Sequence, residues 1–218
     1  YNYIMQNPID SLHLAFPERK CYGSEETSGC GTRGIYYDDP EGRWMKALNR
    51  APNGKDSIYN CIERGWQFYV ARPWASGCFY WTGFDYRGES NPLKFPAAVS
   101  QFGILDYCGF PKDEAYYLKS WWTYEPTLHV FPHWNLKGHE GDTISVWAYS
   151  NCEQVQLIVN GKELEKKYVP QNGHLEWECV YEPGEIKAVG YRFGKPALEE
   201  VIQTTDEASV AEVTADRT

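Results

Sequence analysis

Apolar and polar positions recur with a helical period in parts of the first half of the chain. Residues 56–71 carry apolar side chains at helical spacing, and an Arg-Pro pair follows and ends this predicted helix. Residues 113–122 predict a second helix, with Asp113 near its N-terminus, where a negative charge suits the helix dipole. Residues 8–18 predict a helix or a loop rich in charge.

Short apolar runs separate these segments and predict strands at residues 1–5, 20–24 and 77–81. The third run is almost wholly apolar, which is typical of a strand buried on both faces. Glycine, serine and proline predict loops at residues 26–34 and 82–111. Strands and helices that alternate at this spacing indicate βα units and a parallel sheet. Because a complete (β/α)8 barrel takes roughly 250 residues, residues 1–124 predict only the last part of one.

The pattern changes to short strands after Pro126. Period-2 alternation and turn dipeptides such as Asn160-Gly161 favour an antiparallel β-sandwich of immunoglobulin type over residues 125–204. The predicted strands are 127–131, 143–150, 154–159, 174–181, 184–192 and 199–204. The polar residues 205–218 predict a linker or the start of a further domain. The fold class is therefore α/β plus all-β.

Charge and cysteine content narrow the classes of function. The net charge of −9 argues against a nucleic-acid partner, and no apolar run approaches the roughly 20 residues that span a membrane. The seven cysteines include no C-x-x-C pair and favour free, mostly buried thiols. Such thiols favour the cytoplasm, while a secreted or periplasmic location stays open. No cluster of metal ligands is evident, so we expect neither metal nor cofactor.

Acidic residues follow two of the predicted parallel strands, at the end where barrel enzymes carry their functional groups. Glu25 and Glu26 follow the strand at 20–24, and they either face an active site or begin a solvated loop. Adjacent residues of an extended chain point in opposite directions, so only one of the two can face a site.

The strand at 77–81 leads into Trp81, Asp85 and Glu89. Trp81 is suited to stack on a sugar ring, and the two carboxylates are suited to accept hydrogen bonds from sugar hydroxyls. The alternative is that Trp81 lies in the core and that Asp85 belongs to a turn. The chain is also rich in aromatic residues, at 16%, which fits either a large core or sugar stacking.

Three sequence runs resemble glycoside hydrolase family 2, and the resemblance covers nearly the whole chain. They are Y-G-S-E-E-T-S-G-C-G-T-R-G-I-Y-Y at 22–37, G-C-F-Y-W-T-G-F-D-Y-R-G-E at 77–89 and F-G-I-L-D-Y-C-G-F-P-K-D at 102–113. The resemblance implies that residues 1–124 hold about strands six to eight of the catalytic barrel. It also implies that the sandwich of bacterial β-galactosidases follows them.

The resemblance assigns roles to individual residues. Glu25 matches the catalytic nucleophile, and Tyr3 matches a tyrosine that hydrogen-bonds it. Trp81 matches an active-site tryptophan, and Asp85 lies where relatives contact substrate or order the site. The residues expected to bind substrate are Tyr3, Glu26, Trp81, Asp85 and Glu89.

The implied activity is that of a retaining glycosidase that cleaves terminal β-linked sugars by double displacement, with two carboxyl groups about 5–5.5 Å apart. The family's acid/base glutamate follows an asparagine on the fourth strand, and this sequence contains no Asn-Glu dipeptide. We therefore expect a fragment that lacks the N-terminal part of the same enzyme and is inactive alone. β-Galactosides are the favoured substrates, with β-glucuronides and β-mannosides left open.

Two alternatives remain at this point. The sandwich, with Trp134, Trp147 and Trp177, is either a carbohydrate-binding module or a structural support whose tryptophans pack its core or its interface with the barrel. Homo-oligomerisation is also compatible with the sequence.

Overall fold

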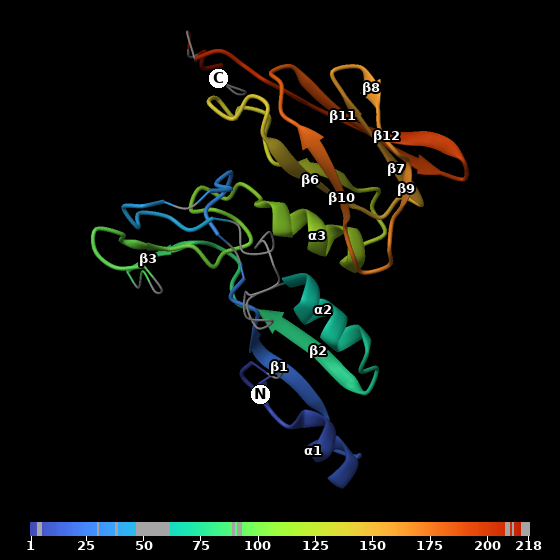
Figure 1. Ribbon diagram of the computed structural model, residues 1–218. Helices are drawn as coiled ribbons and strands as arrows, with labels where there is room; N and C mark the ends of the chain where they lie inside the picture. Colours follow the sequence, from blue (N-terminus) through green and yellow to red (C-terminus); the bar gives the residue numbers. More distant parts are fainter. Residues whose placement is uncertain are drawn as a thin grey trace.

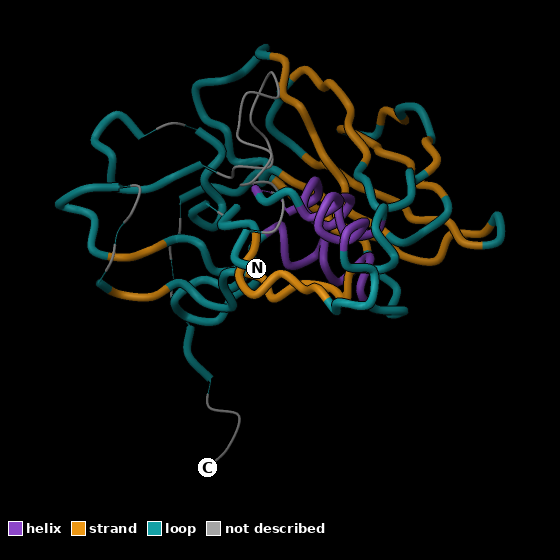
Figure 2. Tube along the Cα trace, turned by 90° about the horizontal axis from the view of Figure 1, so that it is seen from below, coloured by secondary structure: helices purple, strands orange, loops and turns teal. Residues whose placement is uncertain are grey.

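The computed structural model describes residues 1–3, 6–29, 31–37, 39–46, 62–88, 90, 93–207, 210 and 212–214. Parallel strands with helices α1 and α2 occupy one end of the molecule, and antiparallel sheets occupy the other (Figure 1). Helix α3 lies between them. Viewed from below, the helices gather between the two groups of strands, and long loops extend to one side (Figure 2).

The N-terminal part is built from α1 (Ile9–Ala15), β1 (Cys21–Glu26), α2 (Ile62–Val70) and β2 (Ala75–Tyr80). β1 and β2 pair in parallel, and Asn2 forms a parallel bridge with Glu25 on the other side of β1. Three neighbouring segments thus run in parallel in chain order, with a helix between each and the next. The parallel βα arrangement that the sequence predicts is confirmed.

Several predicted boundaries are corrected. β1 continues through Glu26, so the two glutamates end the strand and do not begin a loop. The first helix is shorter than residues 8–18, because α1 stops before Phe16. α2 is described from Ile62, and the predicted start of this helix at 56 lies outside the described residues. The predicted loop 82–111 contains a short antiparallel pair, β3 (Tyr86–Arg87) and β4 (Val99–Ser100).

The C-terminal part contains two antiparallel sheets. The first has the order β10-β6-β5, formed by Leu175–Val180, Thr143–Ser150 and Leu128–Phe131. The second has the order β12-β11-β7-β8, and β9 also pairs with β7. Its strands are β12 (Lys195–Gln203), β11 (Glu185–Arg192), β7 (Gln154–Val159), β8 (Lys162–Glu163) and β9 (Lys167–Tyr168). The predicted strands are therefore present, and the sequence missed β8 and β9.

Alternating side chains of both sheets form a common core. In β10, Leu175, Trp177 and Cys179 are buried while the residues between them are exposed. They pack with Leu157 of β7, Ile186 of β11 and other buried residues in a single cluster. Trp134 belongs to the same cluster and is fully buried. Trp134 and Trp177 therefore pack the core of the sandwich.

Helix α3 (Asp113–Trp122) joins the two parts. Tyr117 and Leu118 of α3 pack with Phe131 and Tyr149 of the sandwich and with Ile62 of α2. Trp147 packs against this cluster and stacks on His174 at 3.8 Å between ring centroids. The interface interpretation of Trp147 is thus confirmed.

The turn at Asn172 also fastens the sandwich to the helices. The Asn172 carbonyl accepts hydrogen bonds from Tyr117 Oη at 2.8 Å and Gln67 Nε2 at 2.9 Å, and its side-chain Oδ1 accepts one from Trp66 Nε1 at 3.0 Å. The turn lies at the dipeptide Asn172-Gly173. It connects the two sheets and docks them on α2 and α3.

Among the described residues, no helix is long and apolar enough to cross a membrane. The cysteines within the described ranges are free, with Cys21, Cys152 and Cys179 buried, Cys78 half-buried and Cys108 exposed.

Candidate functional site

A β-bulge in β1 determines which face of the strand each of its two glutamates occupies. Gly23 pairs with Cys78 and Glu26 with Tyr80, so three steps along β1 match two along β2. Gly23 and Glu26 consequently share a face, although regular alternation puts them on opposite faces. A Cβ atom at Gly23 would lie 2.6 Å from Glu26 Cγ and 2.0 Å from Tyr69 Oη. Glu25 is left on the other face, away from helix α2.

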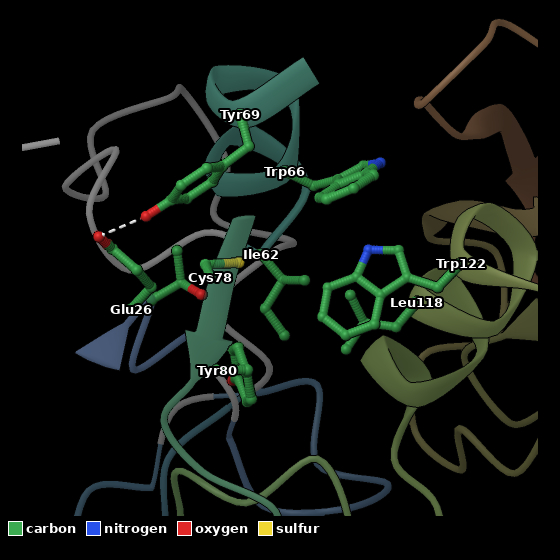
Figure 3. Close-up of a pocket in the computed structure, with 10 residues that line it drawn as sticks. Glu26, Ile62, Trp66, Tyr69, Cys78, Tyr80, Leu118 and Trp122 are labelled. Atoms are coloured by element: carbon green, nitrogen blue, oxygen red, sulfur yellow. Dashed lines mark hydrogen bonds between the residues drawn. The ribbon is translucent and has the colours of Figure 1, made fainter. Parts of the chain in front are cut away.

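Glu26 is fully buried against α2 (Figure 3). Its Oε1 accepts a hydrogen bond from Tyr69 Oη at 2.7 Å. Burial, reinforced by this bond and by the charge of Glu26, raises the pKa of Tyr69, so the phenol stays a donor. Cys78 lies beside the same carboxylate, and burial followed by the charge of Glu26 raises the pKa of Cys78 to about 11. A thiol with this pKa is a poor nucleophile at neutral pH.

The space around Glu26 is a small apolar pocket between β1, β2, α2 and α3 (Figure 3). Ile62, Trp66, Leu118 and Trp122 line it together with the residues named above. The sequence predicted a substrate-binding part for Glu26. The structure places the side chain behind the strand, where it does not reach the space in front of Glu25.

Glu25 is half-buried and lies beside Tyr3. Tyr3 N donates to the Glu25 carbonyl at 2.7 Å, and Tyr3 Oη shares a 2.5 Å hydrogen bond with Ser28 Oγ. Burial, together with the nearby charges of Glu25 and Glu26, raises the pKa of Tyr3, while the hydrogen bond with Ser28 opposes the shift. Tyr3 therefore remains protonated beside Glu25, and the hydrogen bond to the nucleophile that the resemblance implies stays a prediction.

The backbone is strained on both sides of the glutamates. Tyr3 and Thr27 each have φ of 48°, in the left-handed region that β-branched and bulky residues rarely adopt. Strain of this kind persists only where the surroundings fix it, and it gathers at functional sites. Gly65 of α2 provides part of that support, because a Cβ there would lie 2.2 Å from Thr27 Cγ2.

Trp81 directly follows β2, beside the end of β1. Its backbone N–H donates to the Glu26 carbonyl at 2.9 Å, and the Trp81–Thr82 peptide bond is cis. The indole is about one-third exposed and meets the edge of Tyr86 at 6.0 Å between centroids. Its exposure fits the stacking role and not the core alternative.

Asp85 forms a buried ion pair. Its Oδ1 accepts hydrogen bonds from Lys112 Nζ at 2.7 Å and from the Gly103 N–H at 2.9 Å. Burial raises the pKa of Asp85, and Lys112 and the Gly103 amide counteract the shift. Lys112 Nζ also donates to the Gln101 carbonyl at 3.0 Å. Asp85 thus ties the segment after β2 to residues 101–112, which fits the ordering role rather than contact with substrate.

The loops after β1 and after β2 interlock near this edge. Thr32 Oγ1 donates to Gln101 Oε1 at 2.5 Å, and Met45 N donates to the same oxygen at 2.8 Å. Arg33 forms an ion pair with Asp106 at 2.6 Å, which gives the arginine of the T-R-G run a structural role. Glu89 lies outside the described residues, so its predicted role is not placed.

Three of the predicted residues thus gather at one edge of the parallel strands: Glu25 and Tyr3 in direct contact, and Trp81 on the neighbouring strand. The sequence did not single out Tyr69, Lys112 or Gly23. A helical tyrosine and a lone lysine resemble ordinary core and surface residues in a sequence, so no pattern marks them. Within the described ranges, no three His, Cys, Asp or Glu side chains are grouped as metal ligands.

The chain matches a family described as a domain of unknown function, DUF4982, over residues 141–198. It is 35% identical to a β-galactosidase of Bacteroides ovatus, an alignment that covers 100% of this chain and 27% of the relative. It is also 38% identical to a putative β-glucuronidase of Formosa agariphila, over 76% of this chain and 17% of that protein.

A solved family 2 glycosyl hydrolase from Bacteroides cellulosilyticus superposes on the whole chain with a TM-score of 0.74 and 26% identity, over 29% of its own length. The chain belongs to glycoside hydrolase family 2. It spans about a quarter of the length of the curated β-galactosidase that it matches. The resemblance drawn from the three sequence runs is therefore confirmed.

Proposed function

We propose that this chain is the part of a retaining glycoside hydrolase that carries the catalytic nucleophile. Residues 1–124 supply about strands six to eight of the catalytic barrel, and residues 125–204 form an immunoglobulin-like sandwich beside it. The placement of Glu25 is the observation that carries the proposal. It lies one residue before the end of a parallel strand, faces away from the helix layer and lies beside a protonated tyrosine.

The geometry supports a double-displacement mechanism. Glu25 attacks the anomeric carbon, which breaks the glycosidic bond and forms a glycosyl-enzyme ester. A second glutamate, in the part of the enzyme beyond this chain, protonates the departing oxygen and then activates water. Tyr3 lies beside Glu25 and orients its side chain for this attack. Trp81 stacks on the sugar ring from the neighbouring strand.

The open face of the parallel strands supports the partial barrel. Tyr22 of β1 and Phe79 of β2 pack edge to face at 5.9 Å on the side opposite the helices, yet they are 50% and 67% exposed. Aromatic side chains in the interior of a barrel are covered by its other strands. We infer that the remaining strands of the same enzyme cover this pair.

β-Galactosides are the proposed substrates, because the relative aligned over the whole chain is a β-galactosidase. The β-glucuronidase match makes β-glucuronides the competing class. A comparison of kcat/KM for nitrophenyl β-galactoside and β-glucuronide, on the enzyme extended to the length of its relatives, decides between them.

The nucleophile is tested by trapping it. A 2-deoxy-2-fluoro-glycoside with a good leaving group should label Glu25, and mass spectrometry of the digested enzyme should locate the label. Glu25→Gln should lower kcat by about four orders of magnitude or more and abolish labelling. The isolated 218-residue chain should show no turnover, because it lacks the acid/base glutamate. A label on any other residue contradicts the assignment.

A non-catalytic sugar-binding module finds less support. Trp134 and Trp177 are both buried within the sandwich core and present no ring to a sugar. A supporting role for the sandwich fits these positions and the docking of Asn172 on α2 and α3.

A further inference from the structure

The hydrogen bond between Tyr69 and Glu26 lies directly behind the proposed nucleophile and has no part in the mechanism above. Glu26 is the residue next to Glu25, and its carboxylate is fully buried on the helix side of β1. Tyr69 is itself buried, at 5% exposure, and donates to Glu26 at 2.7 Å. A carboxylate in such a place requires a partner, because its burial costs free energy unless it is hydrogen-bonded.

The conformation of β1 depends on where Glu26 points. The bulge between Gly23 and Glu26 is what places both residues on the helix side. If Glu26 left the helix side, the strand would return to regular alternation, and Glu25 would turn toward α2. The side chain of Glu26 and the direction of Glu25 are therefore coupled through two adjacent backbone units.

Helix α2 is placed to hold this arrangement. Gly65 allows the helix to approach Thr27, the residue after Glu26, and Tyr69 lies one turn further along the same face. The missing Cβ of Gly23 leaves the room that the Tyr69 hydroxyl occupies. Three contacts from one helix face thus converge on residues 23–27.

We propose that Glu26 and Tyr69 are positioning residues for Glu25: their buried hydrogen bond fixes the bulge of β1 and so directs the Glu25 carboxylate to the open face. This inference rests on the proposed function of Glu25. It requires an oxygen acceptor of the right shape at position 26 and a hydroxyl donor at position 69. It does not require Glu26 to touch substrate.

The test uses four variants of the enzyme extended to the length of its relatives. Tyr69→Phe removes the donor and Glu26→Leu removes the acceptor, whereas Glu26→Gln keeps an acceptor oxygen of the same shape. Tyr117→Phe is the matched control, because it removes a buried tyrosine hydroxyl of α3 that donates to Asn172, away from β1. Melting temperature, kcat, KM and the rate of labelling by the fluorosugar are measured for each.

We expect Tyr69→Phe and Glu26→Leu to lower kcat and the labelling rate by about 10- to 100-fold with KM changed less than about threefold, as a misdirected nucleophile does. Glu26→Gln should retain kcat within about threefold of the parent enzyme. Tyr117→Phe should lower the melting temperature about as much as Tyr69→Phe while kcat stays unchanged.

Two results overturn the inference while leaving the proposed function intact. In the first, the parent enzyme is labelled on Glu25, yet kcat of both Tyr69→Phe and Glu26→Leu stays within twofold of the parent value. The other is a loss of kcat in Glu26→Gln as large as that in Glu26→Leu. A label elsewhere than Glu25 in the parent enzyme overturns both the proposed function and this inference.

Discussion

At position 23 the backbone of β1 passes close to the hydroxyl of Tyr69. Glycine is required there for space and not for an unusual φ, since a Cβ would lie 2.0 Å from that oxygen. The same lack of a side chain leaves room for Glu26 on the helix face. At the scale of single residues, the site thus depends on a position that carries no functional group.

Gly23→Ala should destabilise the protein by about 1–3 kcal/mol, because the added methyl group overpacks a filled space. Gly83 is the matched control, since a Cβ there would meet no atom within 4 Å. Gly83→Ala should leave the melting temperature within about one degree of the parent protein. Equal losses in the two variants would show that the space at Gly23 is not filled as described.

The sequence predicted Glu25, Tyr3 and Trp81 through family motifs, and the structure brings them to one edge. It could not predict which way Glu26 points. Period-2 reasoning separates adjacent glutamates but does not reveal a bulge, because a bulge depends on the pairing of Gly23 with Cys78 in another strand. Nor does a sequence show that Lys112 is buried, since lysine is among the residues most often exposed.

At the scale of elements, the long segment between β2 and α3 is held by a buried ion pair. Lys112 and Asp85 have side chains only 2% and 8% exposed. By contrast, Lys119 and Glu125 form an ion pair with 44% and 71% exposed side chains. The first pair joins two ends of a loop, and the second links Lys119 of α3 to Glu125 at the surface.

Lys112→Met should therefore cost about 3–5 kcal/mol, because it leaves the Asp85 carboxylate buried without its cation. Lys119→Met should change stability by less than about 1 kcal/mol, as is usual for exposed pairs. Chemical denaturation of both variants measures the difference. Similar small effects would mean that water reaches Asp85.

The secondary structure was largely predictable because the patterns are local. Period-2 alternation located β6 and β7 at their observed bounds, and helical spacing located α3. The short strands β8 and β9 escaped prediction, because two residues are too few to show a period. The contacts of Asn172 also escaped it, because they join residues 55 to 106 positions apart.

At the scale of the whole molecule, a chain of polar contacts runs from the loops of the site to the far sheet. Tyr36 Oη donates to Asp113 Oδ2 at 2.9 Å, and Asp113 Oδ1 meets His129 Nε2 at 2.9 Å. His129 Nδ1 meets Glu200 of β12 at 3.2 Å. His129 thus lies between two carboxylates from different elements and stacks on Tyr116 of α3 at 3.9 Å.

Stability should fall as pH rises through the range in which His129 loses its proton. Burial lowers the pKa of His129, but hydrogen bonds and charges of Asp113 and Glu200 outweigh it and raise the pKa to about 9 from 6.5. Because folding raises this pKa, protonated His129 stabilises the fold fully below about pH 6.5. This contribution to stability is lost as pH rises through 9. It amounts to roughly 3 kcal/mol at most.

Glu114 changes stability in the same direction, because burial, followed by the charge of Asp113, raises its pKa to about 7. Urea denaturation at pH 6 and pH 9 should show the loss in the parent protein and a smaller one in His129→Gln. His139, an exposed histidine that pairs with Asp142, provides the control. If His139→Gln changes the pH dependence as much as His129→Gln does, the buried histidine is not its source.

The bulge in β1 also affects how functional labels pass between relatives. Glu25 and Glu26 are chemically identical in a sequence, and a gap of one residue placed anywhere in 23–26 exchanges them. An alignment with such a gap would assign the proposed role of nucleophile to Glu26, whose carboxylate is buried against helix α2. In this chain, Glu25 and Glu26 are distinguished by the side of β1 that each occupies, which counting positions does not reveal.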